Sequence, residues 1–159
     1  AHPPPVTIWN HIAYERDQLL SKQYSPGNVA ARLSRRYDGG GGKLNRWVEQ
    51  VRDTTDESIP YLDPDSASEG VRILMLFQDP SNAAEGDSGF ISKHNNDPTA
   101  RNYYEVTEAA QVPYEMTLNW NVVPWWSRNC RPVMRWVPSN VTVPLLPANT
   151  AKVLFQASL

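Results

Sequence analysis

The length of the chain, 159 residues, fits one domain. It has 15 basic and 17 acidic residues, and this net charge of −2 excludes a strongly basic nucleic-acid binder. The single cysteine, Cys130, excludes an internal disulfide and a cysteine-held metal cluster, which predicts a reducing, cytoplasmic setting. No run approaches the roughly 18 apolar residues of a membrane helix, and the start lacks the apolar core of a signal peptide, so we expect no membrane partner.

The first part of the chain predicts helices joined by turns. Apolar residues at an imperfect helical spacing predict a first helix over residues 7–20. Turn formers at 25–28 end it, and Asn28 is placed to cap a second helix that runs to about Tyr37. The arginines of this helix predict either a solvated face or an edge that faces phosphate: Arg32, Arg35 and Arg36.

Three further stretches precede residue 71. The glycines at 39–42 do not follow a strand and lack the Gly-Lys-Ser/Thr ending of a phosphate-binding loop, so they predict a flexible connector. Residues 60–65 are rich in turn formers and acidic groups, but their spacing differs from an EF-hand, which favours a solvated loop. Between these stretches one apolar face predicts a third helix: Leu44, Trp47, Val48 and Val51.

Residues 71–126 carry the side chains that we expect to act. The apolar run 71–77 predicts a buried strand that ends in Gln78-Asp79-Pro80, and residues 82–96 predict a long functional or disordered loop. Pro98 and Thr99 predict the start of a helix, with Thr99 as its cap and Pro98 just outside it. Its inward face is predicted from three apolar residues: Val106, Ala109 and Ala110.

A second strand is predicted over residues 116–123, as a central parallel strand that ends at Pro124. The strand–helix–strand order predicts that Asp79 and Asn121 lie at the same carboxyl edge of the sheet, where open α/β sheets bind ligands. Prolines between 127 and 147 disfavour long regular elements, and residues 151–156 predict one more strand.

These elements predict an α/β fold with three layers, α/β/α, around a short, mainly parallel central sheet. We expect a single domain over residues 1–159. It is expected to comprise N-terminal helices and a loop (1–70), a motif-bearing core (71–126) and an irregular segment with a last strand (127–159).

The order of four motifs resembles the uracil-DNA glycosylase superfamily. The motifs are Gln78-Asp79-Pro80, Gly89-Phe90-Ile91-Ser92, Pro98-Thr99-Ala100-Arg101-Asn102 and Asn121-Val122-Val123. The resemblance implies an enzyme that flips uracil or a related damaged base out of DNA and hydrolyses its N-glycosidic bond. It also implies a DNA partner, a monomer, and no metal or cofactor.

The resemblance implies a role for each matching residue. Asp79 would orient and activate water and steady the oxocarbenium-like sugar, which is where the chemistry itself needs a carboxylate. Phe90 would stack beneath the flipped base, while Asn121 would read its edge by donating and accepting, with Gln78 on the O2 side. DNA phosphates would be held by Ser81, Lys93 and Thr99.

Two departures from the family pattern affect the expected activity. Ser81 stands where the best-known branch has a tyrosine that crowds out the thymine methyl, so discrimination against thymine is not implied. No His-Pro-Ser motif follows the last predicted strand, so we expect a truncated or divergent member whose activity is weak or lost. Positive charge near the pocket is expected from Lys93 and Arg101, and from His94, which is expected on a surface loop.

Two other hypotheses remain open at this point. One is a non-catalytic protein that binds DNA or another partner and keeps the glycosylase fold. The other is a small-molecule hydrolase that uses Asp79 in the same strand-end pocket. A glycosylase releases a base from DNA, a binding protein only shifts the mobility of DNA, and a small-molecule hydrolase ignores DNA.

Overall fold

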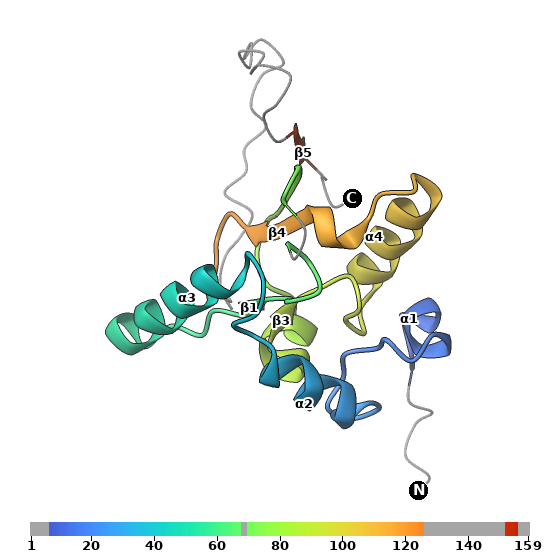
Figure 1. The fold of residues 1–159 in the computed structure, drawn as a ribbon. Coiled ribbons are helices and arrows are strands. Elements are labelled where there is room, and N and C mark those ends of the chain that lie inside the picture. Colours follow the sequence, from blue (N-terminus) through green and yellow to red (C-terminus); the bar gives the residue numbers. More distant parts are fainter. Residues whose placement is uncertain (1–6, 68–69, 126–151, 156–159) are drawn as a thin grey trace, which may run out of the picture.

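The computed structural model describes residues 7–67, 70–125 and 152–155 (Figure 1). Its helices are α1 (His11–Glu15), α2 (Pro26–Ser34), α3 (Gly42–Thr55) and α4 (Pro98–Ala109), with a π-helix η1 (Ala83–Ser88) and a 3-10 helix η2 (Tyr114–Met116). Its strands are β1 (Tyr61–Leu62), β2 (Ile73–Phe77), β3 (Phe90–Ile91), β4 (Thr117–Asn121) and β5 (Lys152–Phe155). None of the helices in these ranges is long and apolar enough to span a membrane.

The strands form two small sheets in which every pair is parallel. One sheet has the order β4-β2-β5 and the other pairs β1 with β3. The predicted α/β class and the strands at 71–77, 116–123 and 151–156 are therefore confirmed. The predicted central position of the 116–123 strand is wrong, because within the described residues β2 lies in the middle and β4 at an edge.

The two faces of β4 pack against different helices. Leu118 and Trp120 pack against a buried cluster that includes Val48 of α3, and the ring centroid of Trp120 lies 6.0 Å from that of Trp47, also in α3. On the alternate residues, the side-chain oxygens of Thr117 and Asn119 both lie within hydrogen-bond distance of the hydroxyl of Tyr103 of α4, which donates to the nearer one, Oδ1 of Asn119. Because successive side chains of a strand point to opposite faces, α3 and α4 cover opposite faces of this part of the sheet (Figure 1).

The start and the buried face of α4 differ from the prediction. Asp97, not Thr99, caps the helix, because its carboxylate accepts a hydrogen bond from the amide of Ala100 at 2.8 Å. Val106 is 60% exposed, so the predicted inward face is wrong. The buried residues of α4 are Ala100, Tyr103, Tyr104 and Thr107. Two of them are tyrosines, whose bulk fills the core while their hydroxyls find partners.

The N-terminal helices are shorter than predicted. Of the helix expected over 7–20, only α1 forms, because Asn10 caps it and Asp17 adopts a left-handed φ of 53° just after it. Asn28 does not cap α2 but lies inside it, where its amide donates to the carbonyl oxygens of Asp17 and Leu19. These side-chain bonds to backbone groups replace the helical bonds that periodicity alone predicts.

The glycines at 39–42 are not a flexible connector but a place of close backbone approach. A β-carbon on Gly42 would lie 1.9 Å from the carbonyl oxygen of Tyr37, and one on Gly40 would lie 2.7 Å from that of Ala67. Both separations are far shorter than van der Waals contact. The side-chain-free backbone therefore lets α3 start directly against the turn at Tyr37 that follows α2.

A Gly42→Ala substitution is therefore expected to destabilise the protein by about 1–3 kcal/mol, because the backbone must move to admit the methyl group. Urea unfolding followed by circular dichroism measures the change. Gly27→Ala is the control, since a β-carbon there meets nothing within 4 Å and a helical glycine-to-alanine change stabilises by up to about 1 kcal/mol. Equal stability of the two variants would contradict the packing described.

Asp63 is fully buried, which corrects the predicted solvated loop at 60–65. Its Oδ1 pairs with Arg32 and accepts the amide of Asp65, and its Oδ2 accepts hydroxyls from Ser92 and from Tyr114, the latter at 3.0 Å. Arg32 is itself 8% exposed, so it is neither on a solvated face nor on a phosphate-facing edge. A buried charge persists only when it is paired in this way.

The pKa of Asp63 follows from these contacts. Burial raises the pKa of the carboxyl, but the imidazole of His94, the guanidinium of Arg32 and the hydroxyl of Ser92 lower it more, so that it lies well below its usual range. His94 is 3% exposed, with Nδ1 3.7 Å from Oδ2 of Asp63, and is not the surface histidine that was expected.

Candidate functional site

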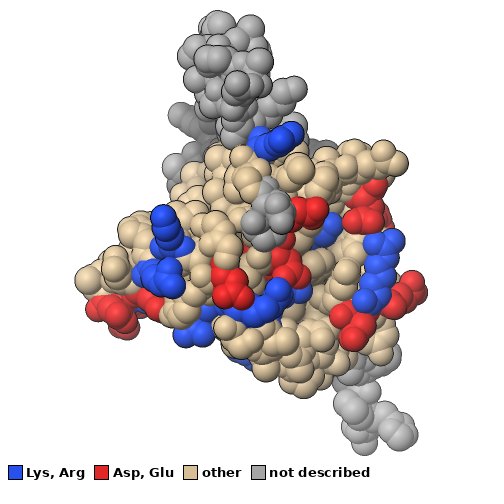
Figure 2. Space-filling model, in the orientation of Figure 1, with Lys and Arg blue, Asp and Glu red and all other residues tan. Residues whose placement is uncertain are grey.

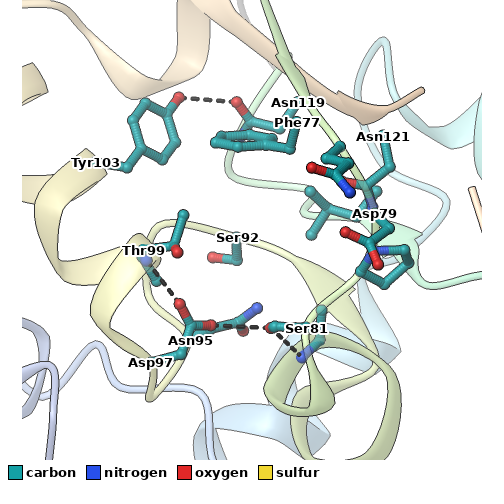
Figure 3. Close-up of a pocket in the computed structure, with 15 residues that line it drawn as sticks. Phe77, Asp79, Ser81, Ser92, Asn95, Asp97, Thr99, Tyr103, Asn119 and Asn121 are labelled. Carbon is teal, nitrogen blue, oxygen red and sulfur yellow. Dashed lines mark hydrogen bonds between the residues drawn. The ribbon is translucent and has the colours of Figure 1, made fainter. Parts of the chain in front are cut away.

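A pocket of about 370 Å³ lies at the carboxyl ends of β2 and β4 (Figure 3). Its volume is that of a small-molecule site. Apolar groups come from Phe77, Pro80, Ala84, Ile91 and Ala100; polar groups come from Gln78, Asp79, Ser81, Ser92, Asn95, Asp97, Thr99, Tyr103, Asn119 and Asn121.

Parallel pairing brings five predicted site residues to this pocket: Gln78, Asp79, Ser81, Thr99 and Asn121. Phe77 pairs with Asn121 in the register of β2 and β4, so the residues after Phe77 continue beside the end of β4. Hydrogen bonds from the amides of Val122 and Val123 to the carbonyl oxygens of Phe77 and Gln78 extend the pairing past the strand ends. Asp79 and Asn121 therefore share the predicted edge of the sheet.

Asn121 lines the pocket with a buried side-chain amide. It is 2% exposed, and its Nδ2 is buried without a hydrogen-bond partner among the described residues. Buried polar groups in native proteins are nearly always paired, so an open donor on a pocket wall indicates a group that a ligand completes. Asp79, in contrast, is only half-buried.

Phe90 does not line the pocket, which corrects its predicted place beneath a base. Its side chain is 0% exposed and packs with Leu20 and Val29, and its ring lies 6.0 Å from that of Tyr61. The aromatic residues that line the pocket within the described ranges are Phe77 and Tyr103, whose rings meet edge-on at 5.6 Å. A phenylalanine on a two-residue strand buried on both faces serves the core.

Lys93 is also placed away from the pocket. It is 3% exposed, and its Nζ lies 3.3 Å from Glu108 and over the rings of Tyr104 and Tyr114. Burial lowers the pKa of this ammonium, although Glu108 raises it. With His94, Lys93 lines a separate cavity of about 510 Å³. Lys93 is therefore not a phosphate contact of the first pocket.

The other expected positive charge is also missing from the pocket. Arg101 pairs with Glu105 at 2.9 Å, and the described residues that line the pocket include no lysine or arginine. Figure 2 shows acidic and basic side chains interspersed on the visible face rather than gathered in one basic patch. The described lining residues therefore form no basic patch that would offset the net charge.

Ser81 and Thr99 lie beside a carboxylate. Ser81 donates its hydroxyl to Oδ2 of Asp97 at 3.0 Å and accepts the amide of Ala84 at 3.2 Å. Asp97 occupies the N-terminus of α4, where a phosphate would otherwise bind. The geometry gives no support to the predicted phosphate contacts at Ser81 and Thr99, because an anion there would meet the charge of Asp97.

Several pocket residues were missed from the sequence: Phe77, Ser92, Asn95, Asp97, Tyr103 and Asn119. Tyr103 donates its hydroxyl to Oδ1 of Asn119 at 2.8 Å, and burial raises the pKa of Tyr103 to about 12, so it stays a donor. One signal could have found Asn119. Thr117, Asn119 and Asn121 alternate with apolar residues in β4, and polar side chains on the buried face of a strand point to a site.

Comparisons of the chain with protein-family models, curated proteins and solved structures find no match. No group of three or more histidine, cysteine, aspartate and glutamate side chains among the described residues could hold a metal ion.

Proposed function

We propose that this chain is a base-excision glycosylase that hydrolyses the N-glycosidic bond of uracil or a related damaged base in DNA. The observation that carries the proposal is the shared pocket of Asp79 and Asn121, in which the amide nitrogen of Asn121 is buried and unpaired. The proposal includes the three-layer fold of the glycosylase family, supported by the packing of α3 and α4 on opposite faces of β4.

The pocket chemistry suits cleavage of this bond. As the bond from the sugar C1′ to the base nitrogen breaks, positive charge develops on the sugar and negative charge on the base. Asp79 steadies the sugar and takes a proton from the water whose oxygen bonds to C1′, while Asn121 donates to a carbonyl oxygen of the departing base. Phe77 supplies the aromatic contact that was expected from Phe90.

The lack of lysine and arginine among the described lining residues favours a second candidate, a hydrolase of small N-glycosides such as nucleosides. A small neutral substrate needs no phosphate contacts, and Asp97 repels a polyanion. The bond cleaved and the role of Asp79 are the same in both candidates, so the size of the substrate separates them.

The test uses single- and double-stranded oligonucleotides with one uracil, beside free deoxyuridine. Alkali-labile sites at the uracil support the glycosylase, and release of uracil from deoxyuridine alone supports the second candidate. Release from neither, by folded protein, contradicts both.

An Asn121→Leu variant is expected to release the base about 10- to 100-fold more slowly, because the buried hydrogen bond to the base is lost. Asn102→Leu is the control, since Asn102 is exposed on α4 and lines neither pocket. The measurement is the initial rate of abasic-site formation. Equal rates for the two variants would contradict the assigned role of Asn121.

A further inference from the structure

A second amide of the pocket carries an open hydrogen-bonding atom of the opposite kind. Asn95 is 2% exposed and lines the pocket, and its Oδ1 is buried with no partner among the described residues. The pocket thus holds one buried open donor, on Asn121, and one buried open acceptor, on Asn95. The two come from different elements, the end of β4 and the loop before α4 (Figure 3).

The orientation of the Asn95 amide is set by its other contacts. Its Nδ2 donates to the carbonyl oxygen of Phe90 at 2.8 Å, and a carbonyl oxygen only accepts, so the nitrogen must lie on that side. The backbone is held as well, because the carbonyl oxygen of Asn95 accepts from the side chain of Asn10 at 3.0 Å. Oδ1 is therefore a fixed, buried acceptor on a residue that lines the pocket.

Three of the four hydroxyls on the described residues that line the pocket are already engaged, and the fourth, that of Thr99, belongs to an exposed residue in the first turn of α4. Ser92 donates its proton to Asp63, Ser81 donates to Asp97, and Tyr103 donates to Asn119. Each of these hydroxyls has one proton, which is already used. A buried acceptor that the protein leaves open is completed by a group from outside, which must itself be a donor.

We propose that Asn95 determines which base the pocket accepts, by accepting a hydrogen bond from an N–H or O–H of the ligand. This inference rests on the proposed binding of a base in the same pocket. The ligand class is a nucleobase that has both a carbonyl oxygen, for Asn121, and a separate N–H or O–H donor, for Asn95. A base whose donor is replaced by a methyl group leaves Oδ1 unpaired and is rejected.

The first test uses the unmodified protein and pairs of free bases that differ by one donor. The pairs are uracil and 3-methyluracil, hypoxanthine and 1-methylhypoxanthine, and 5-hydroxymethyluracil and thymine. NMR titration of the full chain gives a dissociation constant for each. In at least one pair the donor-bearing base is expected to bind about tenfold tighter or more. Equal binding within every pair, or no binding of any base, overturns the proposal.

The second test uses Asn95→Leu, which keeps the approximate size of the side chain and removes the amide. For the pair of bases that the unmodified protein distinguishes, the ratio of the two dissociation constants is expected to fall to about 1 in this variant. The Asn102→Leu variant should keep the ratio of the unmodified protein. A folded Asn95→Leu protein, checked by circular dichroism, that retains the preference overturns the proposal. If this variant does not fold, the comparison of free bases on the unmodified protein decides whether the proposal stands.

The outcome is separable from that of the proposed function. Binding of a free base requires no hydrolysis, so donor-dependent binding without abasic-site formation contradicts the glycosylase and leaves the role of Asn95 standing. Abasic-site formation with equal binding within every pair supports the glycosylase and contradicts the role of Asn95.

Discussion

Replacing Asp79 by asparagine is expected to lower the rate of base release by about 10²- to 10⁴-fold, the range for loss of a positioned general base. Asparagine has nearly the same shape but can neither take a proton from water nor place a negative charge near the sugar. Asp79 is the carboxylate that shares the pocket with Asn121, and it has no side-chain hydrogen bond among the described residues that the substitution would break. The fold should therefore remain.

The measurement is abasic-site formation in uracil-containing oligonucleotides, under single-turnover conditions. Asp53→Asn is the matched control, because Asp53 is an exposed residue of α3 outside both pockets and the change removes the same charge. The control should cleave as the unmodified chain does. Full activity of Asp79→Asn would remove Asp79 from the mechanism, and equal loss in both variants would point to overall charge instead.

Replacing Asp63 by asparagine is expected to cost about 3–5 kcal/mol of unfolding free energy, the range for breaking a buried ion pair. Asp63 is 0% exposed and Arg32 is 8% exposed, so the change leaves a buried guanidinium with only the partly exposed Asp65 as its charge partner. The hydroxyls of Ser92 and Tyr114 also lose a charged acceptor. Urea unfolding at neutral pH measures the loss.

Asp65→Asn is the control for this substitution. Asp65 pairs with the same arginine but is 33% exposed in its side chain, so water screens the pair and a loss of about 1 kcal/mol is expected. If the two variants were equally stable, the burial of the Asp63 pair would not contribute in the way described.

Acid titration gives an independent check on Asp63. Its pKa is lower in the folded protein than in the unfolded chain, so its contribution to stability is fully present above the unfolded value of about 3.9. The contribution is lost as the pH falls from there toward the folded pKa. The unmodified protein should therefore lose stability steeply below about pH 4, and Asp63→Asn should lose it less steeply. If the unfolding free energies of the two proteins fell equally with pH, the lowered pKa of Asp63 would not contribute to acid stability as described.

The elements that the sequence predicted well are those with a local signal. The apolar runs of β2 and β5 and the alternation of β4 are visible in a few consecutive residues, and so is the proline at the start of α4. The cap of α4 was predicted wrongly, because Asp97 and not Thr99 accepts the amide of the first turn. The shared pocket of Asp79 and Asn121 was also predictable, because parallel strands bring the residues that follow them to one edge.

Other features depended on residues far apart in the chain. Arg32 and Asp63 are 31 positions apart, and neither sequence neighbourhood shows that the two charges are buried together. The same holds for Lys93, which was expected to face phosphate and instead packs between two tyrosine rings beside Glu108. From the sequence alone, a charged residue is expected to be exposed to solvent unless its partner is known.

The sequence by itself therefore determined the α/β class, the parallel strands and the meeting of a carboxylate with an amide at the strand ends, because these follow from local periodicity and chain direction. Only the tertiary structure decided that Phe90 belongs to the core, that Phe77 and Asn95 face the pocket, and that two amides there keep open atoms. Which side of a short segment is buried depends on all the elements packed around it, and no local pattern contains that information.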